Sequence, residues 1–225
     1  MIIVTGASKG LGRAICERFH NRGERVVGLA RSDVEGSFET IACDVSDYDS
    51  VKQASRQIKK MGEPVSAVIN AAGIASMNLA VTTDASTVER VIQTNLIGTI
   101  YCCQLFSPLL LRRKAGVIIN FSTIAVALAL KGEAIYVASK AGVEAFSRVF
   151  AREMADFDVR VNCIAPGPIK TDLLKGITDS QIDSILSRQI IQRQFEADEI
   201  CDLVEMLVDE KASTLTGQVF HVGGV

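Results

Sequence analysis

Two side chains that could exchange a proton with a substrate, Tyr136 and Lys140, stand four positions apart in the segment Tyr-Val-Ala-Ser-Lys. In a helix, residues at i and i+4 lie one turn apart on the same face, so the phenol and the ammonium would share one small volume. A nearby positive charge favours the phenolate and lowers the pKa of a tyrosine toward the range useful for general acid/base catalysis. A helix-end tyrosine beside a solvated lysine would show the same spacing, so the rest of the chain must decide.

A glycine-rich segment near the N-terminus could bind phosphate. The apolar run at residues 1–5 leads into Gly6, Gly10 and Gly12, and a helix is predicted over residues 13–21. A strand, a glycine-rich turn and a helix present backbone N–H groups and a helix N-terminus to an anion. The pattern is Gly-x-x-x-Gly-x-Gly rather than Gly-x-Gly-x-x-Gly, and a plain strand-to-helix turn is the alternative interpretation.

The second predicted strand, residues 25–30, ends at Arg31. In dinucleotide folds, an acidic residue at this strand end binds the free 2′-hydroxyl of the adenosine ribose, whereas a basic residue suits a 2′-phosphate. Arg31, with Lys9 in the glycine loop, therefore favours NADP(H) over NAD(H). Asp33 is the competing feature, because its carboxylate could reach the ribose if the strand ends later than predicted.

Apolar runs that alternate with helical segments indicate the fold, since near-continuous apolar runs are typical of parallel strands covered on both faces. The predicted strands are residues 1–5, 25–30, 40–43, 65–69, 116–121, 159–165 and 218–222. The predicted helices are residues 13–21, 47–61 with Ser46 as N-cap, 83–114 as one or two helices, 135–157 and 197–208. This alternation predicts one α/β domain over residues 1–225, a doubly wound parallel sheet with its ligand at the C-terminal strand ends.

Small or polar residues follow two of the central strands. Asn70, Ala71 and Gly73 come after residues 65–69, and their small size leaves room beside a ligand. Ser122 and Thr123 come after residues 116–121. Because neighbouring strand residues point to opposite faces, only one of these two hydroxyls is expected to face the site.

Bulk properties limit the classes of partner. The chain has 225 residues, of which 48% are hydrophobic, with a formal net charge of −2 and two histidines. This near-neutral charge gives no reason to expect nucleic acid or a membrane surface as a partner, and so few histidines make a metal site improbable. The N-terminus resembles no signal peptide and no apolar run is long enough for a membrane span, which predicts a cytoplasmic protein. Six scattered cysteines are expected to be reduced and buried: Cys16, Cys43, Cys102, Cys103, Cys163 and Cys201.

Motifs along nearly the whole chain resemble those of the short-chain dehydrogenase/reductase family, of the compact kind that includes 3-oxoacyl-acyl-carrier-protein reductases. In chain order they are the loop 5–12, Asp44-Val45, residues 70–73, Asn95, the hydroxyl pair 122–123, Tyr136 with Lys140, Pro166-Gly167 with Thr171, and Thr216-Gly217-Gln218. Several independent motifs in the right order make chance an improbable explanation. The resemblance implies a Rossmann-like, doubly wound sheet of seven parallel strands with helices on both faces.

The resemblance also implies a role for each catalytic residue. Tyr136 would give the proton to a carbonyl in reduction and act as the base in alcohol oxidation. Lys140 would hold the nicotinamide ribose and lower the pKa of Tyr136, and Asn95 would position a water relay to Lys140. A hydroxyl of Ser122 or Thr123 would bind the carbonyl oxygen.

The cofactor-binding residues follow from the same resemblance. Asp44 would touch the adenine, Asn70 and Gly73 would line the cofactor channel, and Ile169 and Thr171 would contact the carboxamide end. The full expected set is Gly6, Ser8, Lys9, Gly10, Leu11, Gly12, Arg31, Asp44, Val45, Asn70, Ala71, Gly73, Tyr136, Lys140, Pro166, Gly167, Ile169 and Thr171.

The chain departs from the family pattern at the catalytic hydroxyl. Thr123 takes the place of the usual second serine, thirteen residues before Tyr136, and Ser122 stands one position earlier. The spacing to Tyr136 favours Thr123 as the catalytic hydroxyl, whereas a shift of one residue along the strand would turn Ser122 toward the site instead. Threonine keeps the donor but adds a methyl group and restricts χ1. In addition, the segment before the last helix is short, and Val222-Gly223-Gly224 lacks the acid common before the terminal glycines.

The expected activity is the interconversion of a carbonyl and a secondary alcohol by hydride transfer, with NADP(H), or less favourably NAD(H), as cofactor. The substrate is expected to be a small ketone or a 3-oxoacyl compound, in a pocket built from residues 75–79 and 124–130 under a mobile cover at 172–195. A catalytically silent NADP(H)-binding regulator or scaffold is the alternative, which the intact catalytic residues disfavour. The apolar faces of the long helices predict a homodimer or homotetramer.

Overall fold

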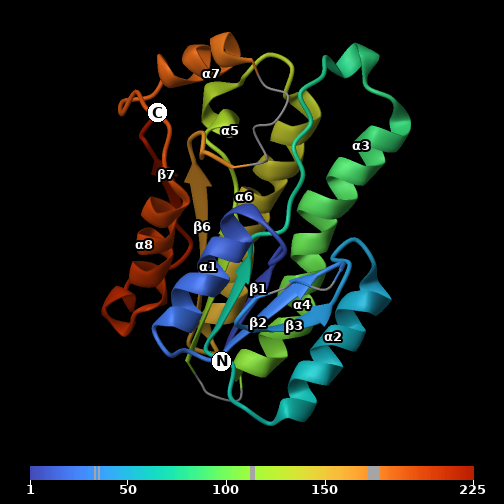
Figure 1. Cartoon of the computed structure of the whole chain (residues 1–225), viewed down its shortest axis with the longest axis vertical. Helices are drawn as coiled ribbons and strands as arrows, with labels where there is room; N and C mark the ends of the chain where they lie inside the picture. The colour runs from blue at the N-terminus through green and yellow to red at the C-terminus, as the bar shows by residue number, and fades with distance from the viewer. Residues whose placement is uncertain (33, 35, 112–114, 172–177) are drawn as a thin grey trace.

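Seven parallel strands form one sheet at the centre of the computed structural model (Figure 1), which describes the chain apart from residues 33, 35, 112–114 and 172–177. The strands are β1 (Ile2–Thr5), β2 (Val26–Ala30), β3 (Glu39–Ala42), β4 (Ala67–Asn70), β5 (Gly116–Phe121), β6 (Val159–Pro166) and β7 (Val219–Val222). Their order across the sheet is β3-β2-β1-β4-β5-β6-β7. The strand order therefore reverses between β1 and β4, which is where ligands bind in doubly wound sheets. The predicted Rossmann-like α/β fold is confirmed.

Helices cover both faces of this sheet (Figure 1). They are α1 (Gly10–Asn21), α2 (Tyr48–Met61), α3 (Ala85–Ile92), the π-helix η2 (Gln93–Ile97), α4 (Gly98–Leu110), α5 (Ala125–Leu128), α6 (Ala134–Ala155), α7 (Asp179–Leu186) and α8 (Ala197–Val208), with short 3-10 helices η1 (Ala80–Thr82) and η5 (Glu210–Ala212). Helices α1 and α8 pack in the hydrophobic core on one face, and α2, α4 and α6 pack in the core on the other.

The side chains of β1 alternate between these two cores. Ile2 and Val4 lie in the core that α1 and α8 share, whereas Ile3 lies in the core of α2, α4 and α6. Because successive strand residues point to opposite faces, a strand covered on both sides must be apolar throughout. Each such side chain contributes about 1.5–3 kcal/mol when fully buried, so these short apolar runs hold the helices onto the sheet.

The C-terminal ends of the central strands are aligned with one another. Thr5 of β1 pairs with Asn70 of β4, Asn70 pairs with Asn120 of β5, and Asn120 pairs with Cys163 of β6. The connections that follow these strands therefore leave the sheet at the same edge. This edge brings together the glycine loop, the segment after β4 and the two hydroxyls after β5.

Two helix starts differ from the sequence-based expectation. Helix α1 begins at Gly10, three residues earlier than predicted, because Lys9 takes the N-cap position. Helix α2 begins after Asp47, whose Oδ1 accepts a hydrogen bond from the Asp49 backbone N–H at 3.1 Å. Asp47 and not Ser46 is therefore the N-cap, and Ser46 binds the carboxylate of Asp44 instead.

Two longer predicted segments differ in detail from the expectation. The helical segment at 83–114 is α3, η2 and α4 in succession, with residues 112–114 outside the described part. Within the predicted cover at 172–195, α7 starts at a capping box in which Thr178 and Gln181 bind each other's backbone N–H groups. The cover therefore contains a capped helix, while residues 172–177 lie outside the described residues.

All six cysteines are free and buried, as predicted. Within the residues that the structure describes, no helix combines the length and apolar character needed to cross a membrane. In the same part of the chain, no group of three or more His, Cys, Asp or Glu side chains could hold a metal ion.

Candidate active site

The glycine loop after β1 packs against the segment after β4. Gly6 has a φ of +73°, and a Cβ at this residue would lie 2.8 Å from Cα of Ala72. The Thr5 hydroxyl accepts a hydrogen bond from the Ala72 N–H at 3.1 Å. A Cβ at Gly12 would overlap the carbonyl oxygen of Gly6. Glycine is required at both positions, and the result is a cradle made of backbone.

The N-terminus of α1 opens into this cradle. The side chain of Lys9 makes no capping hydrogen bond. Gly10 has a φ of +57°, and a Cβ there would meet the Thr171 side chain at 3.8 Å. Ser8 and Lys9 are exposed, and Leu11 packs against the core of α1 and α8. Because uncapped N–H groups and the helix dipole attract anions, the cradle suits a phosphate group.

Arg31 and Asp44 follow β2 and β3 at one end of the sheet edge. Arg31 is exposed and makes no ion pair with any residue that the structure describes. Asp44 is half-buried, and its Oδ1 accepts hydrogen bonds from the backbone N–H and the hydroxyl of Ser46 at 2.9 and 2.6 Å. Val45 is buried beside it. Asp33, the feature that competes with Arg31, lies outside the described residues.

The π-helical turn η2 places Asn95 in the interior, where it is 0% exposed. Its Oδ1 accepts from the Ile74 N–H at 2.8 Å, and its Nδ2 donates to the Ile74 carbonyl at 2.9 Å and to the Ser139 hydroxyl at 3.1 Å. Its own carbonyl accepts from the Thr99 hydroxyl at 2.7 Å. Asn95 therefore ties the segment after β4 to α6, and the water relay stays a prediction. Isolated π turns are frequent at functional sites.

Lys140 is buried in α6 and is only 5% exposed. Its Nζ donates to the carbonyl of Phe121 at 2.9 Å. Burial lowers the pKa of Lys140 to about 8, against a smaller raising contribution from Cys163. A Cβ on Gly73 would lie 3.3 Å from Asn95 Oδ1 and 3.4 Å from Lys140 Nζ. Gly73, Asn95 and Lys140 therefore meet at one point, which a larger side chain at Gly73 would cover.

Tyr136 lies one turn before Lys140 on α6, and the Thr123 side chain lies beside its phenol. Burial, and then the carboxylate of Glu133, raise the pKa of Tyr136 above its ordinary value, while the Thr123 hydroxyl lowers it by less. The predicted lowering of this pKa by Lys140 is therefore wrong, because the ammonium turns toward the Phe121 carbonyl and the phenol loses hydration. The phenol keeps its proton at neutral pH.

The two consecutive hydroxyls after β5 point to different places. Ser122 is 4% exposed and donates to Oε1 of Glu144 on α6 at 2.6 Å. Thr123 contacts Tyr136, and its Oγ1 accepts from the Ala125 N–H at 3.2 Å. This divergence follows from the alternation of neighbouring side chains at a strand end. The fold thus brings Thr123, rather than Ser122, to Tyr136.

Asn70 lies in the core rather than along an open channel. It is 3% exposed, and its Nδ2 donates to Asn120 Oδ1 at 2.8 Å and to Cys103 Sγ at 3.3 Å. Asn120 in turn donates to the Ser147 hydroxyl at 2.8 Å. The Asn70 side chain therefore links β4 to β5 and α4, and Asn120 continues the link to α6. Ala71, the next residue, is half-buried against the opposite core.

The connection after β6 closes the other end of the sheet edge. Gly167, which follows the last residue of β6, is buried under Gln189, whose Oε1 a Cβ at Gly167 would overlap. Ile169 pairs with Phe195 in a parallel bridge. Two residues later, Thr171 reaches the glycine loop. This connection therefore spans the distance from β6 back to the start of α1.

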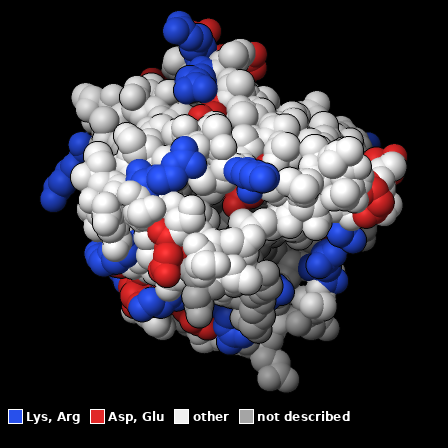
Figure 2. Space-filling view, turned by 90° about the horizontal axis from the view of Figure 1, so that it is seen from above, with Lys and Arg blue, Asp and Glu red and all other residues white. Residues whose placement is uncertain are grey.

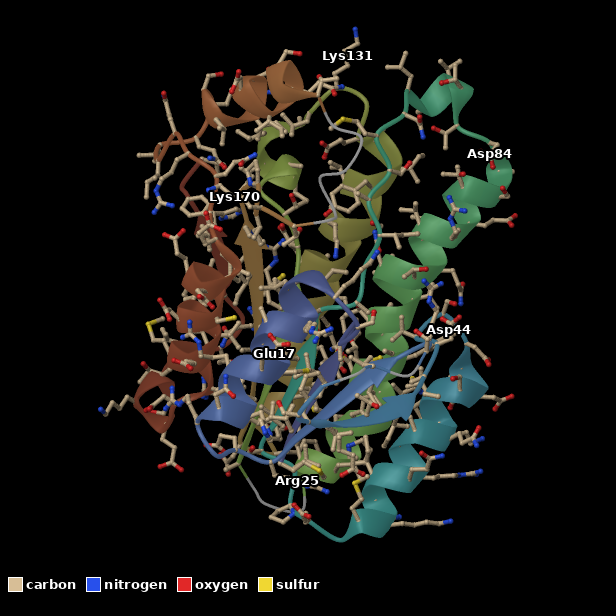
Figure 3. The ribbon with its side chains drawn as sticks, viewed as in Figure 1. Glu17, Arg25, Asp44, Asp84, Lys131 and Lys170 are labelled. Carbon is tan, nitrogen blue, oxygen red and sulfur yellow. The ribbon has the colours of Figure 1, made fainter. Side chains whose placement is uncertain are left out.

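Two views show the edge as a whole. In Figure 3, Asp44 at the start of α2 and Lys170 beside β6 lie on opposite sides of α1. Seen from above in Figure 2, this end of the molecule is largely uncharged and is hollowed, with both basic and acidic side chains spread around it.

Two buried acids near Tyr136 and Lys140 were missed by sequence reasoning. Glu133 and Glu144 are 6% and 5% exposed. Burial raises the pKa of Glu133, which precedes Tyr136 by three residues. Glu144 follows Lys140 by four residues, so that the spacing Tyr136, Lys140, Glu144 repeats every four positions. That repeat on one helical face was the signal that could have revealed Glu144.

Comparisons with known proteins agree with this geometry. The family model described as Enoyl-(Acyl carrier protein) reductase matches residues 6–224. The 3-oxoacyl-acyl-carrier-protein reductase FabG of Staphylococcus epidermidis is 34% identical over 236 residues, which cover 99% of this chain and 96% of the relative. The corresponding FabG of Salmonella typhimurium is 32% identical over 231 residues, covering 99% and 95%.

A solved structure of Thermoplasma acidophilum aldohexose dehydrogenase in ligand-free form superposes with a TM-score of 0.90 at 31% identity, over 99% of this chain and 92% of that one. The crystal structure of gox2181 superposes with a TM-score of 0.91 at 26% identity, over 98% and 93%. The sequence and structural matches run from the glycine loop to the last strand. The chain therefore belongs to the short-chain dehydrogenase/reductase family.

Proposed function

We propose that this oxidoreductase interconverts a carbonyl and a secondary alcohol with NADP(H), and that Tyr136 is its acid/base. The observation that carries the proposal is the placement of the Thr123 side chain beside the Tyr136 phenol, one helical turn from the buried ammonium of Lys140. The Tyr136 phenol can give a proton to a carbonyl oxygen while the Thr123 hydroxyl donates a second hydrogen bond to that oxygen.

The residues around the sheet edge fit a dinucleotide. The glycines at 6 and 12 form a backbone cradle at the N-terminus of α1, which suits a diphosphate. Because Gly73 has no side chain to cover the Lys140 ammonium, the donors that the Phe121 carbonyl does not use would bind ribose hydroxyls. Bound there, NADP(H) would supply the hydride, while the protein supplies orientation and the proton.

The protonation states at neutral pH suit carbonyl reduction. Because the pKa of Tyr136 is raised, the phenol holds a proton to donate. Lys140, whose pKa burial lowers to about 8, is still mostly cationic at pH 7 and would stabilise the phenolate left after the transfer. The Thr123 hydroxyl would hold the substrate oxygen beside Tyr136.

The preference for NADP(H) rests on two exposed cations. Arg31 and Lys9 flank the place where the adenosine ribose would lie, and Arg31 makes no ion pair with any described residue that would compete with a 2′-phosphate. A guanidinium binds phosphate oxygens in pairs, which favours Arg31 as the main contact.

We infer a small ketone or a 3-oxoacyl compound as the substrate. Two relatives are named as 3-oxoacyl-acyl-carrier-protein reductases. Leu79 and Val81 expose 48% and 89% of their surface, and Ile124 packs with Leu128 in a small apolar cluster. Apolar side chains in both segments suit an acyl or alkyl chain better than a charged one.

The oligomeric state of the chain and its cellular compartment also stay predictions. Val149 on α6 and Phe157 just after it expose 58% and 46% of their surface, and a second copy of the chain in a homodimer or homotetramer would cover them. We expect these assemblies in the cytoplasm.

The direct test is to measure the oxidation of NADPH and of NADH by the purified chain with small ketones, aldoses and 3-oxoacyl thioesters. We expect turnover with NADPH and at least one carbonyl class. NADPH binding without oxidation of any substrate would support the catalytically silent alternative instead, which the likeness to reductases and a dehydrogenase does not favour.

A further inference from the structure

Ser122 and Glu144 form a buried pair beside the catalytic group. They are 4% and 5% exposed, and Ser122 Oγ lies 2.6 Å from Glu144 Oε1 and 3.4 Å from the carbonyl of Lys140. The Ser122 N–H donates to the Ile164 carbonyl of β6 at 2.7 Å. Ser122 is therefore held by its backbone to β6 and by its side chain to α6.

The chemistry of the pair fixes where the Ser122 proton goes. A carboxylate accepts hydrogen bonds and donates none, so Ser122 must be the donor, and a hydroxyl has only one proton to give. A hydrogen bond to a charged acceptor is stronger than one to a neutral acceptor. With its proton committed to Glu144, Ser122 has none left for the oxygen of a substrate.

Glu144 is an unusual residue to bury at this place. A carboxylate in the interior is costly unless it is paired and hydrogen-bonded. The charged or titratable groups that face it are Arg148, whose guanidinium lies 3.8 Å away on the same helix, and Cys163 of β6. Arg148 is exposed on its side chain by 55%, so Ser122 is the close partner inside the protein.

We propose that Glu144 is a positioning residue of the active site: by binding the Ser122 hydroxyl to α6, it makes Thr123 the hydroxyl that faces Tyr136 and the substrate. Because side chains alternate at the end of β5, fixing one of the two hydroxyls fixes the other. This inference rests on the proposed carbonyl reductase function, in which Thr123 binds the carbonyl oxygen.

A double-mutant cycle tests the proposal. The variants are Glu144→Ala and Thr123→Ala, alone and combined, with kcat and KM measured for NADPH-dependent reduction of the best carbonyl substrate. We expect Thr123→Ala to lower kcat by about 10²-fold, the effect of losing one hydrogen-bond donor to a reacting oxygen. Glu144→Ala should lower kcat about tenfold through misplacement of Thr123.

The decisive number is the effect of Glu144→Ala in the Thr123→Ala background. A residue that acts through Thr123 has no further effect there, so the combined variant should match Thr123→Ala within about twofold. A tenfold fall in both backgrounds would mean that Glu144 only stabilises the fold and would overturn the proposal. Unchanged kcat in Glu144→Ala alone would overturn it as well.

Two further variants serve as controls for the double-mutant cycle. Glu144→Gln keeps an acceptor for Ser122 and should recover most of the activity that Glu144→Ala loses. Glu153→Ala removes an exposed acid from the same helix and should leave kcat unchanged. If Glu144→Ala does not fold, Ser122→Ala replaces it in the cycle, because it removes the same hydrogen bond with a smaller change.

If the wild-type chain reduces none of the carbonyls, the proposed function fails, but the positioning role of Glu144 can still be tested. Crystal structures of wild type and Glu144→Ala then decide the positioning. Rotation of the Thr123 side chain away from Tyr136 in the variant supports the proposal, and an unchanged Thr123 overturns it.

Discussion

The two halves of the sheet edge differ in how firmly their side chains are held before any ligand binds. In the proposed catalytic half, beside β4 and β5, Asn95, Ser122 and Lys140 are at most 5% exposed, and each makes a hydrogen bond of 3.1 Å or less. In the proposed nucleotide half, beside β1 and β2, Ser8, Lys9 and Arg31 are exposed.

The difference shows where precision is needed. Proton and hydride transfer require donors within a few tenths of an ångström of the right place, so the catalytic half is fixed by buried hydrogen bonds. A phosphate is a large charged group that backbone N–H donors and flexible cations can bind from several directions. Glycines shape the proposed nucleotide half, and we expect its exposed side chains to become ordered when a nucleotide binds.

The largest change to the catalytic half should come from Tyr136→Phe. The ring stays and the proton is lost, so kcat for carbonyl reduction should fall by about 10³-fold. The affinity for NADPH, measured by fluorescence titration, should stay near the wild-type value. Turnover at the wild-type rate would refute the role of Tyr136, and the exposed Tyr48→Phe is the matched control.

The largest change to the nucleotide half should come from Gly12→Ala. The added Cβ overlaps the carbonyl of Gly6, so the loop must move away from the start of α1. Loss of one backbone hydrogen bond to a phosphate, about 1.5–3 kcal/mol, corresponds to a rise in the NADPH Kd of roughly 10- to 100-fold. Gly36→Ala is the control, because its Cβ meets Phe38 at an ordinary 3.5 Å. Equal Kd values for the two variants would contradict the cradle.

The buried ammonium of Lys140 gives a prediction for stability against pH. Its pKa is about 8 in the folded protein, against an ordinary value of 10.5 for an exposed lysine. Between these values the unfolded chain binds more protons, so the folded state gains stability as the pH rises. From pH 8 to 10, the free energy of unfolding of wild type should rise by about 2 kcal/mol relative to Lys140→Met. Denaturant titrations at each pH measure it, and taking the difference between the two proteins cancels the titration of tyrosines and cysteines. A constant difference would mean that Lys140 is hydrated.

The smallest effect should be that of Arg31→Ala. An exposed ion pair is worth up to about 1 kcal/mol, so the ratio of NADH to NADPH dissociation constants should fall about fivefold. Arg56→Ala, which removes an exposed arginine from α2, should leave the ratio unchanged. If both variants keep the wild-type ratio, cofactor choice does not depend on Arg31.

The sequence predicted the sheet and the glycine loop better than the side-chain arrangement around Tyr136. Apolar strands, positive-φ glycines and a Tyr-x-x-x-Lys spacing are local patterns, and β5 was predicted with its observed bounds. The direction of the Tyr136 pKa shift was wrong, because helical spacing gives the nearness of Lys140 but neither the burial of the phenol nor the turn of the ammonium toward Phe121.

The choice between Ser122 and Thr123 stayed open in the sequence for a related reason. It depends on Glu144, which lies more than twenty residues away along the chain and becomes a neighbour only when α6 packs on β5. Likewise, no local sequence pattern predicts that the turn at Asn95 is π-helical rather than part of a regular α-helix. Contacts between distant segments, and not local propensity, decide both.

The π turn η2 has a consequence for how this helix could tolerate deletions. A π turn holds one more residue than an α-helical turn, so removing Thr94 could restore a continuous α-helix from α3 into α4. The deletion would also rotate the residues before it relative to those after it, because each residue advances an α-helix by about 100°. The shortened helix would stay intact, but Asn95 would turn away from Ile74 and Ser139. The extra residue of the π turn therefore sets the rotation of α3 relative to α4 about the helix axis.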